Sequence, residues 1–413
     1  MSGLTLTVHR ATDQIGGNCI ELATADGRVL LDVGRPLDAP KEATDLLPKS
    51  LNVERPVDGV LISHPHQDHY GLLDELPPAW PIYSGASAGK LMHLTASIFG
   101  TAPVRDYRHW SGSQPIDVGP FRVTPYLTDH SAFDAYMLLI EAAGKRVLYS
   151  GDFRNHGRKA ALVERLMAAP PRDVDVLLME GTNLGSDKPT KSEHDLEEDF
   201  VSLFRDTPGR VFTCWSAQNI DRTVTLYRAA VKTGRTLVID LYTAEVLELL
   251  ADAGKLPRAG WNNIKVVITR SFARLYEMKG RKDFVERMAA HGMSAAALAQ
   301  NPGKWVVMIR PSLIRDFAAK GVVPTAADAW SYSQWRGYLE QPNGVALKAW
   351  FDGGGARSVH LHTSGHASTA DLKAFATAIS PKALVPIHGV AWDTDRDGFE
   401  NVIRLTDGEP LAI

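Results

Sequence analysis

The hydrophobic pattern of the N-terminal part of the chain predicts short strands joined by turns. Residues 4–8 alternate between apolar and polar positions. Strand-like runs at residues 18–22 and 28–32 are separated by Asp-Gly at positions 26–27, which is a strong hairpin signal. Residues 59–63 form a short, continuous apolar run typical of a buried strand. These patterns together indicate a β-rich unit.

From about residue 208 the pattern changes to strands that alternate with helices. The apolar run at residues 236–240, for example, follows a segment of helical periodicity at residues 219–232. Such alternation predicts an α/β unit with a parallel sheet covered on both faces. Strand character returns at residues 358–362 and 383–387. We therefore expect one β-rich domain in two parts, residues 1–207 and 347–413, with the α/β unit inserted at residues 208–346.

Composition and charge narrow the class of protein. With 413 residues, of which 44% are hydrophobic, the chain has ample material for two to three globular domains. A net charge of -3 excludes a uniformly basic surface but leaves a local basic groove open. The only cysteines, Cys19 and Cys214, exclude a disulfide framework and a zinc site built mainly from thiolates. The sequence shows neither a signal peptide nor a long apolar run, so we expect a cytoplasmic protein without a membrane span.

Candidate metal ligands follow the apolar run at residues 59–63. His64, His66, Asp68 and His69 lie within six residues of one another. Nitrogen and oxygen donors without a thiolate suit zinc or manganese. A solvated polar turn is the alternative interpretation, but three imidazoles and a carboxylate directly after a buried strand favour a metal site.

Further candidate donors follow other strand-like runs. His130, Asp152 and His388 each lie a few residues beyond such a run. One histidine or aspartate at a strand end is usually a turn or cap residue. The repetition predicts that these side chains converge at one edge of a sheet.

This set of motifs, with Ile15-Gly-Gly-Asn18 and Leu30-Leu-Asp-Val-Gly34, resembles the metallo-β-lactamase superfamily. The resemblance implies an αββα sandwich and two divalent metal ions, for which zinc is expected and manganese is also compatible. Two such ions share a water molecule and supply a hydroxide nucleophile. Asp32 and Asp129 are candidates for fixing the imidazole tautomers, or are ordinary turn acids. The implied ligands are His64, His66 and His130 for one ion, Asp68, His69 and His388 for the other, and Asp152 between them.

The C-terminal motifs resemble the β-CASP nucleases, in particular the ribonuclease J branch. The matching motif runs from His362 through Ser364 to His366, and Glu180 matches the acidic motif of the branch. The resemblance implies that His366 acts as a general acid oriented by Glu180, and that Asp68 belongs to the same catalytic group. The alternative for His366 is a cap of the helix that follows it.

Several residues are candidates for contacts with a substrate phosphate or nucleic-acid backbone. Ser216 and Asn219 lie at a predicted helix N-terminus, a natural anion site, although plain capping explains them equally well. By resemblance, His362 and Ser364 are further phosphate contacts. A basic run with two aromatic residues is either a nucleic-acid grip or a solvated helix face; it comprises Arg270, Phe272, Arg274, Tyr276, Lys279, Arg281 and Lys282. Four tryptophans are expected in the core rather than as stacking platforms: Trp305, Trp330, Trp335 and Trp350.

The sequence therefore predicts a metal-dependent nuclease that hydrolyses phosphodiester bonds in single-stranded RNA or DNA. The alternative is a small-molecule hydrolase of the same superfamily that acts on a lactone, thioester or phosphoester. A non-catalytic scaffold is the third reading, which the full ligand set disfavours. The sequence leaves a homo-oligomer open.

Overall fold

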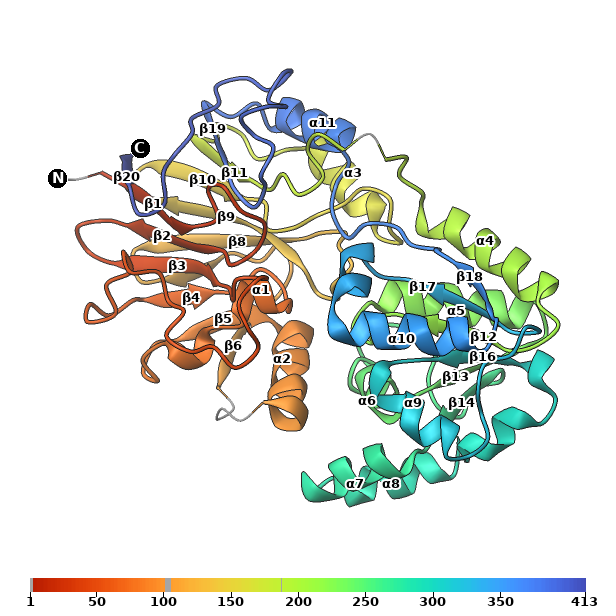
Figure 1. Ribbon diagram of the computed structural model, residues 1–413. Coiled ribbons are helices and arrows are strands. Elements are labelled where there is room, and N and C mark those ends of the chain that lie inside the picture. Colours follow the sequence, from red (N-terminus) through yellow and green to blue (C-terminus); the bar gives the residue numbers. More distant parts are fainter. Residues whose placement is uncertain (1–2, 101–104, 187) are drawn as a thin grey trace. The chain divides into compact units, whose positions relative to one another are not determined.

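The computed structural model describes residues 3–100, 105–186 and 188–413, which form two compact units (Figure 1). The first unit comprises Met1–Ala96, Gly100–Pro189 and Gly365–Ile413, and the second comprises Ser97–Phe99 and Thr190–Ser364. The second unit is longer than the insertion expected at residues 208–346. Helix α4 (Glu193–Asp206) and strand β18 (Arg357–Val359) account for the difference, because α4 packs on α5 (Ile220–Lys232) and β18 pairs with β17 (Ala329–Tyr332). The division of the chain into folding domains stays a prediction.

The first unit contains two stacked sheets. In spatial order, the first sheet consists of β20 (Pro410–Ala412), β1 (Thr5–Arg10), β2 (Cys19–Ala23), β3 (Arg28–Val33), β4 (Gly59–Leu61), β5 (Ile82–Gly85) and β6 (Tyr107–Trp110). The second consists of β19 (Ala383–Pro386), β11 (Val176–Met179), β10 (Lys145–Tyr149), β9 (Tyr136–Ala142), β8 (Phe121–Leu127) and β7 (Ile116–Val118). The C-terminal segment thus supplies an edge strand to each sheet.

Alternation along the strands builds the layers. In β9, Leu138 and Ile140 belong to the core between the two sheets, whereas Met137 and Leu139 pack in a separate cluster with helices α3 (Ala160–Ala168) and α11 (Thr369–Ile379). The outer face of the first sheet is covered by a third cluster, which includes α2 (Ala86–Phe99), α1 (Gln67–Tyr70) and η1 (Leu73–Glu75). The predicted αββα sandwich is confirmed.

The second unit is built on a parallel sheet. Its strands, in spatial order, are β15 (Gly292–Met293), β14 (Ile264–Val267), β13 (Thr236–Ile239), β16 (Trp305–Met308), β12 (Val211–Cys214), β17 and β18. The remaining helices of the unit are α6 (Leu241–Leu249), α7 (Arg270–Met278), α8 (Lys282–Ala289), η2 (Ala295–Ala299), η3 (Pro302–Lys304), α9 (Pro311–Ala318), η4 (Arg336–Glu340) and α10 (Pro342–Gly353). Every residue of β12, β13 and β17 is buried, as expected for a sheet with both faces covered. The predicted parallel sheet is confirmed.

Within the described residues, no helix is long and apolar enough to cross a membrane.

Candidate active site

The strand directions of the second sheet bring donors from distant parts of the chain together. Strands β10, β11 and β19 are parallel neighbours, so their carboxyl ends lie at one edge of the sheet. Asp152, Glu180 and His388 follow these three ends. Strand β8 runs in the same direction as β10, because both are antiparallel to β9, and His130 follows its end. The convergence predicted from the sequence is observed.

The first sheet supplies the remaining donors through the loop after β4. His64 and His66 lie in this loop, and Asp68 and His69 lie in the short helix α1. The loop packs so closely on Gly34 that a Cβ atom there would lie 1.7 Å from the carbonyl oxygen of Asp68. Only glycine fits at this position, so the close approach of the loop explains why glycine follows β3.

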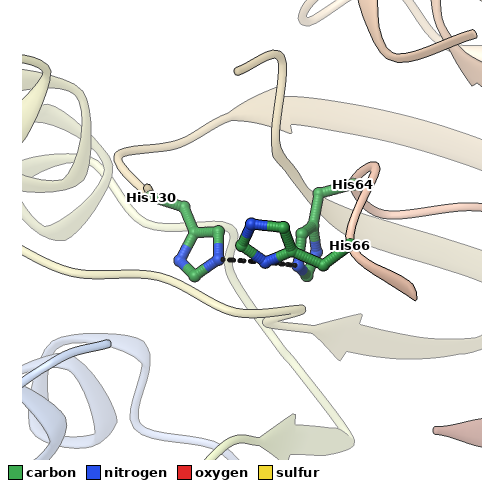
Figure 2. A group of neighbouring side chains, drawn as sticks. All are labelled: His64, His66 and His130. Atoms are coloured by element: carbon green, nitrogen blue, oxygen red, sulfur yellow. Dashed lines mark hydrogen bonds between the residues drawn. The ribbon is translucent and has the colours of Figure 1, made fainter. Parts of the chain in front are cut away.

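Three imidazoles form a first cluster (Figure 2). Nε2 of His64 and Nε2 of His130 each lie 3.2 Å from Nδ1 of His66. Nδ1 of His130 donates a hydrogen bond to the carbonyl oxygen of Gly365, so Nε2 carries the lone pair of the neutral ring. Burial, reinforced by the neighbouring imidazoles, holds the pKa of His64 and His130 well below the usual value and lowers the pKa of His66 to about 4. The cluster therefore presents neutral nitrogen donors.

Two carboxylates and two imidazoles form a second cluster. Asp68, His69, Asp152 and His388 place one donor atom each within 4.8 Å of the others. Nε2 of His69 lies 3.1 Å from Oδ2 of Asp152, and Nε2 of His388 lies 3.4 Å from Oδ2 of Asp68. Although burial raises the pKa of a carboxyl group, the surrounding histidines hold the pKa of Asp152 well below its usual value. Asp152 therefore stays ionised within this cluster.

Asp152 lies between the two clusters and has unsatisfied oxygens. Its Oδ2 is 3.7 Å from Nε2 of His64 and 3.7 Å from Nε2 of His388. Among the described residues, neither carboxylate oxygen of Asp152 accepts a hydrogen bond, and Nε2 of His69 also has no hydrogen-bond partner. Buried polar atoms are rarely left unsatisfied, because the desolvation penalty is then uncompensated. A bound cation would satisfy all three atoms, so the residues present fit a metal centre.

Asp32, at a position of positive φ near the end of β3, connects the two clusters. Its Oδ2 accepts hydrogen bonds from Nδ1 of His69 and from the Ser63 hydroxyl, both at 2.7 Å. The Ser63 oxygen in turn lies 3.0 Å from Nδ1 of His64 and accepts from it. Both ring orientations are fixed in this way, with Nε2 turned toward the centre. Asp129, the other candidate for this role, accepts hydrogen bonds from Gly157 and Arg154.

His388 is held from two sides. Its backbone has a φ of +49°, a left-handed conformation that is uncommon for residues other than glycine. Its Nδ1 lies 2.8 Å from the hydroxyl of Thr182, which leaves Nε2 directed toward Asp68 and Asp152. Thr182 therefore has the same role for His388 that Asp32 has for His69.

His366 and Glu180 form a pair beside the second cluster. Nδ1 of His366 lies 3.0 Å from Oε2 of Glu180. Burial alone would lower the pKa of His366, but the charges of Glu180 and Asp152 outweigh it and raise the pKa to about 9. The Glu180 oxygens also accept hydrogen bonds from the backbone N–H groups of Phe153 and Thr182. Glu180 is thus satisfied by the chain itself, unlike Asp152, although it lies within reach of a third possible metal group with Asp152, His366 and His388.

The four predicted phosphate contacts belong to the second unit. Ser216 is exposed, and Asn219 caps α5 by accepting a hydrogen bond from Arg222 N–H. His362 has a buried Nδ1 without a hydrogen-bond partner among the described residues, and burial lowers its pKa to about 3. Ser364 ends the unit. Their predicted contact with phosphate stays a prediction.

The structure brings together all seven predicted metal ligands, with His366 and Glu180 beside them, within the first unit. The roles assigned to these residues stay predictions. The sequence reasoning missed Thr182 and the carbonyl oxygen of Gly365. Thr182 lies two residues after Glu180, so the same strand-end argument points to it; a backbone carbonyl carries no comparable signal.

Comparisons with known proteins agree with this geometry. Residues 12–189 match the family model of the metallo-beta-lactamase superfamily, and residues 356–395 match that of the Zn-dependent metallo-hydrolase RNA specificity domain. The second match contains His366 and His388.

Related proteins include ribonuclease J from several bacteria. The protein of Helicobacter pylori (strain B128) is 25% identical over 401 residues, which cover 91% of this chain and 54% of the relative. That of Mycobacterium tuberculosis (strain H37Rv) is 24% identical and covers 94% of this chain and 69% of the relative. The chain thus spans about half the length of the Helicobacter protein. A crystal structure of a protein of unknown function from Enterococcus faecalis V583 has a TM-score of 0.79 at 20% identity, with 100% of both chains covered, and shares the fold.

Proposed function

Because the chain carries a metallo-β-lactamase domain, we propose that this domain hydrolyses phosphodiester bonds in single-stranded RNA with the help of two bound divalent metal ions. The observation that carries the proposal is that buried atoms of Asp152 and His69 have no hydrogen-bond partner among the described residues, while the imidazole of His366 lies beside them and contacts Glu180. The match to an RNA specificity domain over residues 356–395 and the similarity to ribonuclease J support RNA as the substrate.

The donor set supports two ions, most compatible with zinc. His64, His66 and His130 would hold the first ion, and Asp68, His69 and His388 the second, with Asp152 shared between them. Imidazole nitrogens and carboxylate oxygens suit zinc and also manganese. Such ions supply a water molecule of lowered pKa as the nucleophile and positive charge for the phosphoryl oxygens.

The chain's own residues orient the ligands and move a proton. Asp32 keeps Nδ1 of His69 protonated, and Thr182 is the partner of Nδ1 of His388, so the Nε2 atoms stay available. Glu180 holds Nδ1–H of His366, which leaves Nε2–H as the proton donor. His366 gives this proton to the oxygen that leaves phosphorus. A general acid of this kind contributes about 10²–10⁴ in rate.

The test separates metal binding from proton transfer. End-labelled single-stranded RNA and DNA are incubated with the wild-type protein, with and without chelator, and metal content is measured by mass spectrometry. We expect RNA cleavage that chelator abolishes and that zinc or manganese restores, and we expect Asp68→Ala to lose both metal and cleavage.

His366→Ala is the sharper variant. We expect unchanged metal content with turnover lowered about 10²–10⁴-fold. His93→Ala, which removes an exposed histidine from α2 of the same unit, is the matched control and leaves both properties unchanged. Loss of metal in His366→Ala would contradict the acid role and favour the third metal group. Hydrolysis of a generic ester or lactone without cleavage of any nucleic acid would overturn the nuclease function.

A further inference from the structure

Two aromatic side chains are exposed on the second unit. The side chain of Trp335 is 61% exposed and that of Tyr338 is 40% exposed. Trp330, only five residues earlier, is 2% exposed and meets the expectation of a core tryptophan. The expectation of a core position is therefore wrong for Trp335. Two neighbouring aromatic rings that are both exposed give this loop an apolar surface that water can reach.

The Trp335 ring packs against its own loop. Its centroid lies 5.3 Å from that of the Tyr338 ring, at an interplanar angle of 86°, which is an edge-to-face contact. A Cβ atom at Gly337 would lie 2.0 Å from the Trp335 ring, so the ring lies against the backbone of residue 337 and only glycine leaves room for it. The backbone N–H of Tyr338 donates to the carbonyl oxygen of Trp335 and closes the turn. The exposed ring thus contacts both the Tyr338 ring and the backbone of its own loop.

The loop that carries these rings neighbours the segment that leads to His366. Strands β17 and β18 are parallel neighbours, so the loops after them leave the same edge of the sheet. Nε2 of His360, in the loop after β18, lies 3.1 Å from the carbonyl oxygen of Gln334, in the loop after β17. His366 follows His360 by six residues in the chain.

We propose that Trp335, braced by Tyr338, is a stacking platform for one unpaired base of a single-stranded RNA substrate. This inference rests on the proposed function. The adjacent exposed residues Arg336 and Glu340 are charged, so polar side chains flank the two rings along the chain. An exposed aromatic ring offers a flat face on which a planar base can stack, and Arg336 beside it offers a positive charge for the RNA backbone.

The test measures RNA affinity on the metal-loaded protein in which His366→Ala slows turnover. Stacking of a base on an aromatic side chain predicts that Trp335→Ala weakens binding of a single-stranded RNA by roughly tenfold. Trp335→Phe retains most of the affinity. Trp335→Leu keeps an apolar side chain but lacks an aromatic face, so we expect it to lose affinity as Trp335→Ala does. This variant distinguishes the loss of stacking from a folding defect of Trp335→Ala. Trp305→Ala is the matched control, and we expect it to leave RNA affinity unchanged. Trp305 begins β16, so it lies at the amino-terminal ends of the parallel strands, whereas Trp335 lies beyond their carboxyl ends.

An abasic scan provides the signature that a structural role would not produce. A series of RNAs carries one abasic nucleotide at successive positions. For the protein that retains Trp335, we expect an abasic nucleotide at one position to lower the affinity for RNA. In Trp335→Ala, we expect an abasic nucleotide at the same position to lower the affinity no further. RNA that is bound and cleaved with no position coupled to Trp335 would overturn the platform alone. Failure of the wild-type protein to bind or cleave any RNA would overturn both the platform and the proposed function.

Discussion

Replacement of Asp32 by asparagine tests whether one buried carboxylate fixes both proposed metal-binding clusters. Asp32 is fully buried, and its Oδ2 accepts hydrogen bonds from Tyr149 OH, Ser63 Oγ and Nδ1 of His69, while its Oδ1 accepts from Ser63 N–H. The side chain of asparagine has the same shape but replaces one acceptor oxygen by an NH₂ group. In either orientation this group faces a donor.

The magnitude follows from this mismatch. If the amide oxygen keeps the Oδ2 position, the NH₂ group faces Ser63 N–H, and a buried donor without an acceptor costs about 1–3 kcal/mol. The hydrogen bond from Nδ1 of His69 also loses its charged acceptor. Loss of such a partner of a metal ligand typically lowers metal affinity about 10–100-fold, which corresponds to about 1.4–2.8 kcal/mol. The first figure is the expected loss in the free energy of unfolding, and the second is the expected loss in the free energy of metal binding.

The assay is a chelator competition that reports metal affinity for wild type and for Asp32→Asn, together with the thermal unfolding of the metal-free proteins. Asp134→Asn is the matched control. Asp134 lies in the same unit and accepts hydrogen bonds from the N–H groups of Ser87 and Ala88 and from Tyr136 OH, but none of these is a proposed ligand. We expect both variants to lose stability and only Asp32→Asn to lose metal. Wild-type metal affinity in Asp32→Asn would refute the reasoning.

Two further predictions concern other buried contacts. Thr182→Val removes the hydroxyl that contacts Nδ1 of His388, so we expect chelator competition to show a weaker second ion and an unchanged first one; equal loss of both ions would contradict the separate clusters. Glu193→Gln leaves the fully buried Arg222 without its charged partner, so we expect a loss of about 3–5 kcal/mol in the free energy of unfolding, measured by urea denaturation. A change below about 1 kcal/mol would show that Arg222 finds another acceptor.

The convergence of the proposed metal ligands could be predicted from the sequence because each of these residues follows an apolar strand. The run that forms β10 leads to Asp152, and the run that forms β19 leads to His388. Parallel neighbours place such positions at one sheet edge, so the pattern alone indicates convergence. The partners of these ligands were harder to predict. The contact of His130 with the carbonyl oxygen of Gly365 joins residues 235 positions apart, and every residue has a carbonyl group.

The aromatic residues show a different limit of sequence reasoning. Phe272 and Tyr276 lie beside the basic residues of α7 and were candidates for contact with nucleic acid, but they are 6% and 0% exposed. Their spacing of four residues places them on one face of α7, and this face packs on the core. The helical periodicity alone therefore predicts that both side chains are buried.

The exposure of Trp335 could not be predicted from helical periodicity. Trp335 precedes the short 3₁₀ helix η4, which is too short for a repeating pattern of buried and exposed positions. The basic run is also weaker as an anchor than its composition indicates, since Arg281 pairs with Glu245 and Lys282 lies 3.5 Å from Glu286. Paired cations release fewer counterions on binding RNA, so they contribute less affinity. The exposed ring of Trp335 has no such competing partner charge, which makes the loop after β17 a stronger candidate for RNA contact than α7.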